Sequence, residues 1–358
     1  MRKYYLDNLR NFTIIVIILF HVLFIYSSIP LVGSIGNSNK NQIHDIFQYM
    51  VYPWITIVLF IISGISSYHY LQKNDDFLSD RTNKLLVPCT LGPLLYGYIS
   101  GYFILIISGY FFYIPEINKI SFYFFVTIFG IGPLWFNFIL WLNSLLLILI
   151  RKYEHNKLYN YCINLNFTKI LYLGIGLWIS AQLLNVPVAI VFRFGIYVYS
   201  FLLGYYIFSH ESNIKYLESN CFFLLFIAIG FGFFYIYKNF GKDFTSHEVF
   251  KSFLSVSFSW FSCLALLGIS KKYFNKEYTF TIFMRKKSYG IYLLHYNFIS
   301  TVGYYLHIYT NWSLICKYIV VGLSSFFGAL LLFEIISRIP YIRWLILGIY
   351  FKKKKKIS

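Results

Sequence analysis

Long apolar runs recur along nearly the whole chain and constrain its fold more than any other feature. A membrane-spanning helix needs about 20 consecutive, mainly apolar residues, and ten stretches of about this length can be placed. They run at about 12–32, 48–70, 85–110, 134–150, 167–185, 187–208, 219–237, 250–270, 288–309 and 314–337. Only 12% of the residues are charged, whereas a soluble domain has about 25%. We therefore predict an all-α, polytopic membrane protein with about ten transmembrane helices.

The fourth of these stretches is the weakest. Residues 120–130 are also apolar, but Gly130, Gly132 and Pro133 interrupt the run before the fourth span. This piece is expected to be re-entrant or interfacial and to lead into that span. The fifth and sixth spans are separated only by Asn185-Val186-Pro187, which predicts a tight hairpin.

The basic residues predict the orientation of the chain. If the N-terminus is cytoplasmic, 24 Lys and Arg side chains fall in inner segments and only 5 in outer ones. Cytoplasmic loops carry such an excess, so both termini are predicted to be cytoplasmic. We assign residues 1–340 to a transmembrane domain and 341–358 to an interfacial segment with a basic tail, which should lie against anionic headgroups. The net charge of +18 therefore indicates topology and not nucleic-acid binding, because no loop is long enough to present a folded basic surface.

Two familiar sequence signals are absent. The five cysteines stand singly, so neither a disulfide framework nor a metal site is predicted. The first apolar run is too long for a signal peptide and has no small-residue cleavage site after it, so we expect a retained first helix.

The first apolar run holds the strongest functional signal, the pair Arg10 and His21. Eleven residues at 100° per residue place both side chains on one helix face, roughly 16 Å apart along the axis. An ionisable residue inside a membrane is costly and marks a functional site by default, and an imidazole with an unperturbed pKa of about 6.5 suits proton transfer. The alternative is a histidine that hydrogen-bonds a neighbouring helix.

Two further candidates lie near the inner surface. Arg81 and Lys84 are one turn apart within residues 77–88 and can hold phosphate or lipid headgroups, although the positive-inside rule accounts for them equally well. Ser63 and Gly64 form a small-residue patch that allows close approach of another helix or of a ligand.

Two ionisable residues stand in the last two spans. His295 lies about 10 Å inside its helix start and His21 about 14 Å inside its own, so the two histidines could share one cavity. Glu334 is four residues before Arg338 and can pair with it, or it can meet Arg10.

Arg193 is predicted inside the sixth span, about 9 Å from its outer end. It either extends outward to the interface as a structural residue or lines an outward-facing acceptor pocket. His44 and Asp45, before the second span, lack any spacing that would complete a metal site, and we interpret them as a solvated loop.

Five motifs in this order resemble the signature of the acyltransferase-3 family of integral-membrane acyltransferases. They are Arg10-x10-His21, Phe60-Ile-Ile-Ser63-Gly64, Phe77-x3-Arg81-x2-Lys84-Leu-x2-Pro88, Leu134-Trp135-Phe136 and Ser288-x3-Tyr292-x2-His295. The start Tyr5-Leu-Asp7-Asn-Leu-Arg10 and the end Glu334-x3-Arg338, followed by Gly348, look like the glucan-biosynthesis (OpgC/MdoC-like) branch. The chain departs from the family at Pro133, where relatives often have histidine, and at Lys84, where arginine is commoner.

The resemblance implies an enzyme that transfers an acyl group from a cytoplasmic acyl-CoA to a hydroxyl of a glycan. The donor is expected to be acetyl-CoA or succinyl-CoA, and no permanently bound cofactor is expected. By matching position the resemblance implies that His21 is the catalytic base or acyl relay and that Arg10 organises the donor site. It assigns Arg81 and Lys84 to the CoA phosphates. The matched small residues Ser63 and Gly64 are assigned to the donor site as well. Substrate or supporting positions are Asp7, Trp135, Arg193, Tyr292, His295 and Glu334.

Partners implied by this interpretation are acyl-CoA, a glycan or polysaccharide acceptor, membrane lipids and a possible separate extracytoplasmic transferase, at the plasma or inner membrane. The rival hypothesis is a transporter or flippase for a polysaccharide or lipid-linked glycan. It explains the helices equally well, but its expected symmetric halves with paired broken helices are not visible. A scaffold without activity would not need Arg10 and His21 on one face.

Overall fold

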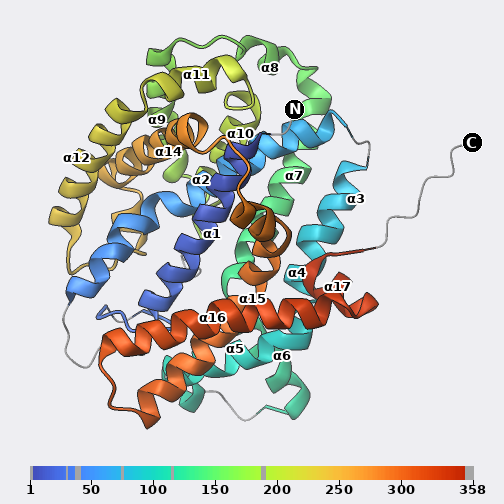
Figure 1. Ribbon diagram of the computed structural model, residues 1–358, viewed down its shortest axis with the longest axis vertical. Coiled ribbons are helices and arrows are strands. Elements are labelled where there is room, and N and C mark those ends of the chain that lie inside the picture. The colour runs from blue at the N-terminus through green and yellow to red at the C-terminus, as the bar shows by residue number, and fades with distance from the viewer. Residues whose placement is uncertain are drawn as a thin grey trace, which may run out of the picture. The chain divides into compact units, whose positions relative to one another are not determined.

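The computed structural model describes residues 3–29, 31–36, 42–73, 76–113, 117–186 and 191–350. This part of the chain is helical, and its one β-type contact is an isolated bridge between Asn185 and Arg193 (Figure 1). The chain divides into two compact units, residues 1–75 with 142–288 (unit 1) and residues 76–141 with 289–358 (unit 2), and each is described by itself. The lysine run at 352–356 and Pro187 of the predicted hairpin lie outside the described residues.

Each of the ten predicted stretches contains helix, but not all of them are long apolar helices. Within the described ranges, six helices are long and apolar enough to cross a membrane, or seven if one bent pair counts as a single span. The six contain α1 (Tyr4–Phe24), α2 (Ile46–Leu71), α7 (Trp135–Glu154), α12 (Cys221–Asn239), α14 (Phe253–Tyr273) and α16 (Leu314–Ser337). The bent pair joins residues 77–90 to α5 (Pro93–Ile107) at an angle of 42°. The described part of the chain is thus all-helical with six or seven candidate membrane spans, and the predicted number of ten is not reached by length and composition.

Three predicted spans account for the difference. Two of them, α9 (Phe167–Ala181) and α10 (Phe194–Tyr206), have 15 and 13 residues, fewer than about 20. The third, α15 (Thr279–Tyr309), has 31 residues, but its tyrosine, serine, asparagine and histidine side chains lower its hydropathy. It also begins nine residues before the predicted span, because the basic run at 285–287 continues the helix.

Unit 1 is built around α2, which packs against α1, α10 and α14. Helices α12 and α14 lie side by side in this unit (Figure 1). The shorter elements are η1 (Gln42–Asp45), α8 (Lys157–Tyr161), α11 (Glu211–Ser219) and α13 (His247–Phe250).

The tightest helix crossing in unit 1 joins α2 to α10 at two glycines. A Cβ atom on Gly64 would overlap the carbonyl oxygen of Phe201 and lie 2.8 Å from the nitrogen of Tyr205, and one on Gly204 would overlap the carbonyl oxygen of Ile61. Only glycine lets the two backbones approach so closely. The small-residue patch predicted on α2 therefore packs against a helix at Gly64.

Unit 2 begins with a chain of short helices and ends with two long ones. Its short elements are α3 (Phe77–Arg81), η2 (Thr82–Leu86), α4 (Val87–Thr90), η3 (Tyr110–Tyr113), α6 (Lys119–Phe129), η4 (Gly132–Leu134) and α17 (Pro340–Leu347). α6 packs on α5 at a second glycine contact, where a Cβ atom on Gly130 would overlap the carbonyl of Gly97. The predicted interruption at Gly130 and Pro133 is confirmed, since α6 ends at Phe129 and α7 begins at Trp135.

An ion cluster closes one end of unit 1. Lys3 Nζ lies 3.2 Å from Glu211 Oε2, and Lys271 Nζ pairs with Glu211 Oε1. The carboxylate therefore connects the start of the chain, α11 and the last turn of α14. Burial alone would raise the pKa of the Glu211 carboxyl, but the hydrogen bond from Lys271 and the charges of both lysines outweigh it and hold this pKa below its usual value.

We predict that replacing Gly64 with alanine destabilises the protein, because the added methyl group has to push α10 away from α2. Overpacking of this kind costs about 1–3 kcal/mol. Gly230 in α12 is the matched control, since a Cβ atom there meets nothing within 4 Å, and Gly230→Ala should be neutral or slightly stabilising through its higher helix propensity. The measurement is the thermal unfolding midpoint of each variant in detergent. Equal midpoints for the two variants would contradict the packing assignment.

A second prediction concerns pH. Because the folded-state pKa of Glu211 is depressed, its ion pairs stabilise the fold above the unfolded-state pKa of about 4.3, and this contribution is lost as the pH falls through the folded-state value. The difference in unfolding midpoint between wild type and Glu211→Gln should therefore be present at neutral pH and shrink on acidification. Glu248→Gln, at an exposed position on α13, is the control. A difference that stays constant with pH would show that the glutamate does not act through its charge.

Candidate functional site

Arg10 joins α1 to α2 through its guanidinium. Its Nη2 donates a hydrogen bond to Ser66 Oγ at 2.9 Å, and its Nη1 lies 3.6 Å from Asp7 Oδ1, one helical turn earlier. The Ser66 hydroxyl in turn donates to the carbonyl of Ile62. The arginine side chain remains 38% exposed, so it is held in place while part of it stays accessible.

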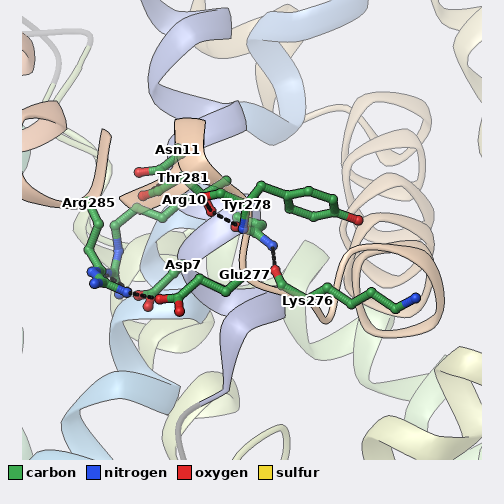
Figure 2. A network of polar contacts seen from close by, with 9 residues as sticks. Asp7, Arg10, Asn11, Lys276, Glu277, Tyr278, Thr281 and Arg285 are labelled. Carbon is green, nitrogen blue, oxygen red and sulfur yellow. Dashed lines mark hydrogen bonds and ion pairs between the residues drawn. The ribbon is translucent and has the colours of Figure 1, made fainter. Parts of the chain in front are cut away.

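Two asparagines next to this pair fasten a loop onto α1. Asn8 Nδ2 donates to the carbonyls of Phe274 and Lys276 at 2.6 and 2.8 Å, and Asn11 Nδ2 donates to the carbonyl of Thr281 at 3.5 Å. Both asparagines are buried. The segment between α14 and α15 is thus fixed beside the first three turns of α1 (Figure 2).

The same region carries a second ion pair. Arg285 Nη1 lies 2.8 Å from Glu277 Oε1, and Figure 2 draws both residues in one network of polar contacts with Asp7 and Arg10. Cations and carboxylates therefore gather at the N-terminal part of α1 in unit 1. We call this group, with Asn8 and Asn11, the α1 network.

The sequence analysis did not single out four members of the α1 network, namely Asn8, Asn11, Glu277 and Arg285. A signal was available for the asparagines, because amide side chains three residues apart share a helix face. The partners of all four lie in another part of the chain, which no local pattern indicates.

His21 lies three turns beyond Arg10 on the same unbroken helix. The helix runs from Tyr4 to Phe24, so the predicted sharing of one face and the separation of roughly 16 Å apply. The His21 ring is half-buried and meets the neighbouring Phe20 ring edge-on, with centroids 5.5 Å apart. Phe20 also stacks on Tyr52 of α2 at 5.9 Å.

Of the predicted donor-site residues, Ser63 lies about one turn before Ser66 on α2, and Gly64 follows Ser63 directly. Gly64 faces the backbone of α10, as described above, so the space at its Cα is filled by protein. The carbonyl of Ser63 accepts a hydrogen bond from the Ser67 hydroxyl.

Arg193 lies immediately before α10 and not inside a helix, which corrects the predicted position. It does not extend outward, because only 1% of the residue is exposed. Its Nη1 donates to the Tyr52 hydroxyl at 3.0 Å, its Nη2 donates to the carbonyl of Thr245, and its guanidinium lies 3.7 Å from the centroid of the Phe250 ring. The structural alternative of an arginine that reaches the interface is therefore wrong.

In unit 2, Arg81 is the last residue of α3, and Lys84 stands on the turn between α3 and α4. The Arg81 guanidinium lies 5.1 Å from the centroid of the Phe77 ring, and the Lys84 side chain is exposed. The turn η2 between Thr82 and Leu86 is π-helical, a geometry that recurs at functional sites.

Neutral side chains hold the backbone of this turn. Pro88 has no N–H to donate to the carbonyl of Lys84, four residues earlier, and the Tyr289 hydroxyl donates to that carbonyl instead. Tyr289 also accepts a hydrogen bond from Asn137 Nδ2 at 3.0 Å, and Asn137 is buried. Tyr289 and Asn137 are thus supporting residues that were not predicted as site residues.

The end of the described chain covers the other side of the turn. Trp344 Nε1 donates to Asn83 Oδ1 at 2.9 Å, and Trp141 Nε1 donates to Thr82 Oγ1 at 3.0 Å. Gly348, with φ +63°, packs against the backbone, where an added Cβ would lie 2.8 Å from the Cα of Lys84. The turn of residues 82–86, which we call the basic turn, is therefore held by hydrogen bonds to Thr82 and Asn83, while the Lys84 side chain is exposed.

Three other predicted residues of unit 2 lie near one another on α15 and at the start of α7. The Tyr292 hydroxyl donates to the carbonyl of Pro133, two residues before Trp135, and His295 Nδ1 lies 2.7 Å from the carbonyl oxygen of Tyr292. His295 is fully buried. Glu334 stands on α16 next to Phe333, which packs against Gly290 of α15.

The predicted site residues are divided between the two units. Unit 1 holds Asp7, Arg10, His21, Ser63, Gly64 and Arg193, and unit 2 holds Arg81, Lys84, Trp135, Tyr292, His295 and Glu334. The cavity predicted for His21 and His295 remains a prediction, because these histidines belong to different units.

The comparisons with known proteins identify the family. The model of the acyltransferase domain of the acyltransferase-3 family matches residues 3–334, nearly the whole chain, and the protein therefore belongs to this family. The family and the apolar helices together define a multi-pass membrane acyltransferase. Neither the comparison with curated proteins nor that with solved structures found a match.

We predict that Tyr289→Phe loosens the basic turn, because it leaves the Lys84 carbonyl without its hydroxyl donor and Asn137 without its acceptor. Asn137 is buried, and a buried polar group that loses its acceptor costs about 1–3 kcal/mol. The measurement is hydrogen exchange of the amides of residues 82–89, which should become faster. Tyr309→Phe, at a position that is 76% exposed on the same helix, serves as the control, and equal exchange in both variants would refute the supporting role.

Proposed function

We propose that this protein is an acyl-CoA-dependent O-acyltransferase that moves an acetyl or succinyl group to a hydroxyl of a cell-envelope polysaccharide or glycan. The observation that carries the proposal is the placement of Arg10 and His21 on one face of the unbroken helix α1, with Arg10 held between Asp7 and Ser66. This arrangement places Arg10, a cation that can bind an anionic donor, and His21, a group that can accept a proton, on the same helix.

The α1 network supports donor binding. A guanidinium forms charge-assisted hydrogen bonds to phosphate and carboxylate, and Arg10 is both partly exposed and fixed by α2. The network fixes the loop of residues 274–281 beside it. In unit 2, the exposed Lys84 and the nearby Arg81 would contact the phosphates of the coenzyme, as the family motif implies.

His21 would supply the acid–base step. In direct transfer, the acceptor hydroxyl oxygen forms a bond to the thioester carbonyl carbon, His21 takes the hydroxyl proton, and the carbon–sulfur bond breaks. The coenzyme leaves as its thiol after receiving a proton. In the relay form, a ring nitrogen of His21 first accepts the acyl group and then gives it to the acceptor hydroxyl.

The finer topology belongs to the same proposal. We assign ten spans with both termini cytoplasmic, an inner- or plasma-membrane location, and membership of the glucan-biosynthesis branch. Short helices such as α9 and α10 would serve as spans within a locally thinned bilayer. A separate extracytoplasmic transferase could complete the reaction if the protein itself only carries the acyl group across.

The test uses inside-out membrane vesicles supplied with acetyl-CoA or succinyl-CoA labelled in the acyl group. Wild type should transfer label to glycan or protein, whereas His21→Ala should lose about 100-fold or more of the rate, the low end of the effect of a general base. Arg10→Lys should mainly weaken use of the donor, because lysine cannot reproduce a forked hydrogen bond.

Two exposed residues provide controls, His307→Ala on α15 and Lys152→Gln on α7, and both should transfer label like wild type. An unchanged Michaelis constant and turnover in Arg10→Lys would remove that residue from the donor site. If no acyl-CoA donates label while glycan crosses the membrane in a protein-dependent way, the transporter hypothesis replaces the enzyme.

A further inference from the structure

Arg193 is a buried cation that has no carboxylate partner in the described part of the chain. Its partners are the Tyr52 hydroxyl, the carbonyl of Thr245 and the rings of Tyr52 and Phe250, and the neutral Tyr197 hydroxyl lies beside it as well. Its Nε is buried and has no hydrogen-bond partner. A buried charge is costly unless it is paired, so this guanidinium lacks a counter-ion.

The position of Arg193 in the fold makes this cost larger. It is the residue before the first turn of α10, where the helix dipole is positive. A cation is favourable at the opposite end of a helix. The first turn of α10 is also fixed in place, because a Cβ atom on Gly195 would overlap the carbonyl oxygens of Ser180 and Leu183. The Arg193 guanidinium and the N-terminus of α10 are thus two sources of positive potential at one fixed place. Helix N-termini bind anions for the same electrostatic reason.

A second unsatisfied polar group lies one turn from the arginine's tyrosine partner. Gln48 precedes Tyr52 by four residues on α2, so the two side chains share a helix face. Gln48 is fully buried, and neither atom of its side-chain amide has a hydrogen-bond partner. Buried amides are nearly always paired, which makes Gln48 a further indication of a missing ligand.

The surroundings suit a sugar derivative. The Tyr52 ring lies 5.2 Å from that of Phe244 and 5.8 Å from that of Phe250. Phe20 stacks on Tyr52 and immediately precedes His21 on α1. A group held at this place is therefore next to the helix that carries the candidate catalytic histidine. The loop that caps it, around Thr245, lies on the outer side in the proposed orientation.

We propose that Arg193, Gln48 and Tyr52 bind an anionic group, a carboxylate or a phosphate, of the glycan acceptor. The inference rests on the proposed function in naming the acceptor as the source of the anion. The Arg193 Nε–H donates to an anionic oxygen, the Gln48 amide hydrogen-bonds a neighbouring polar group, and Tyr52 holds the guanidinium in position. The protein would then select acidic glycans over neutral ones.

The experiment measures equilibrium binding to the purified full-length protein in detergent, without any acyl donor. The probes are an oligogalacturonate, its neutral carboxyl-reduced counterpart and a glycerol-phosphate oligomer. Wild type should bind at least one acidic probe about tenfold or more tightly than the neutral one, the size of effect expected for a hydrogen bond to a charged group. The acidic probe that binds identifies the anion as carboxylate or phosphate.

Variants locate the binding to this place. Arg193→Gln should remove the preference for the acidic probe, and Tyr52→Phe, which keeps the aromatic packing, should reduce it. Lys242→Gln removes an exposed charge from the same loop and should leave the preference unchanged.

Equal binding of acidic and neutral probes by wild type would overturn the proposal, and this comparison needs no variant to fold. Loss of the preference in Lys242→Gln but not in Tyr52→Phe would also overturn it. Because the binding assay needs no acyl-CoA, selective binding here combined with no acyl transfer in the vesicle assay would contradict the enzyme and leave the anion site intact.

Discussion

The polar groups that this chain carries into its apolar helices need partners inside the protein, because hydrocarbon offers none. Helix α1 shows how the constraint is met in unit 1. Asn8 and Asn11 donate to backbone carbonyls of a distant loop, and Arg10 is held by a serine and an aspartate. Each of these contacts also fixes the N-terminal part of the helix that carries the candidate catalytic histidine three turns further on. The packing that the membrane demands and the arrangement that the site needs are therefore the same contacts.

Besides these polar contacts, close helix crossings at glycine hold the structure together, because glycine lets two backbones approach closely. The crossing of α2 and α10 at Gly64 and Gly204 fixes the helix that carries Ser66 against the helix that follows Arg193. Arg10 and Arg193 thus both depend on one close helix pair. In unit 2 the contact between Gly97 and Gly130 does the same for α5 and α6, directly before the turn that leads to Trp135.

Much of the helical architecture could be predicted from the sequence, because apolar runs and the breaks at Gly130 and Pro133 are local signals. The ends of helices were less predictable. α1 begins at Tyr4 and not near residue 12, because Asn8 and Asn11 find partners that only the folded chain provides. The position of Arg193 outside a helix was missed for a similar reason, since its partners Tyr52 and Thr245 lie far away in sequence.

Arg10 and Arg193 differ in a way that bears on the proposed mechanism. Arg10 has a carboxylate beside it at 3.6 Å, so its charge is balanced before any donor arrives, and a donor phosphate has to compete with Asp7. Arg193 has no such partner in the described chain and remains uncompensated until an anion binds. Under the proposed function, weak, exchangeable binding suits a donor that leaves as free coenzyme after each turnover, whereas a preformed, unbalanced cation favours selection of the acceptor by its charge. The proposed division of roles between Arg10 and Arg193 thus rests on which arginine already has a carboxylate beside it.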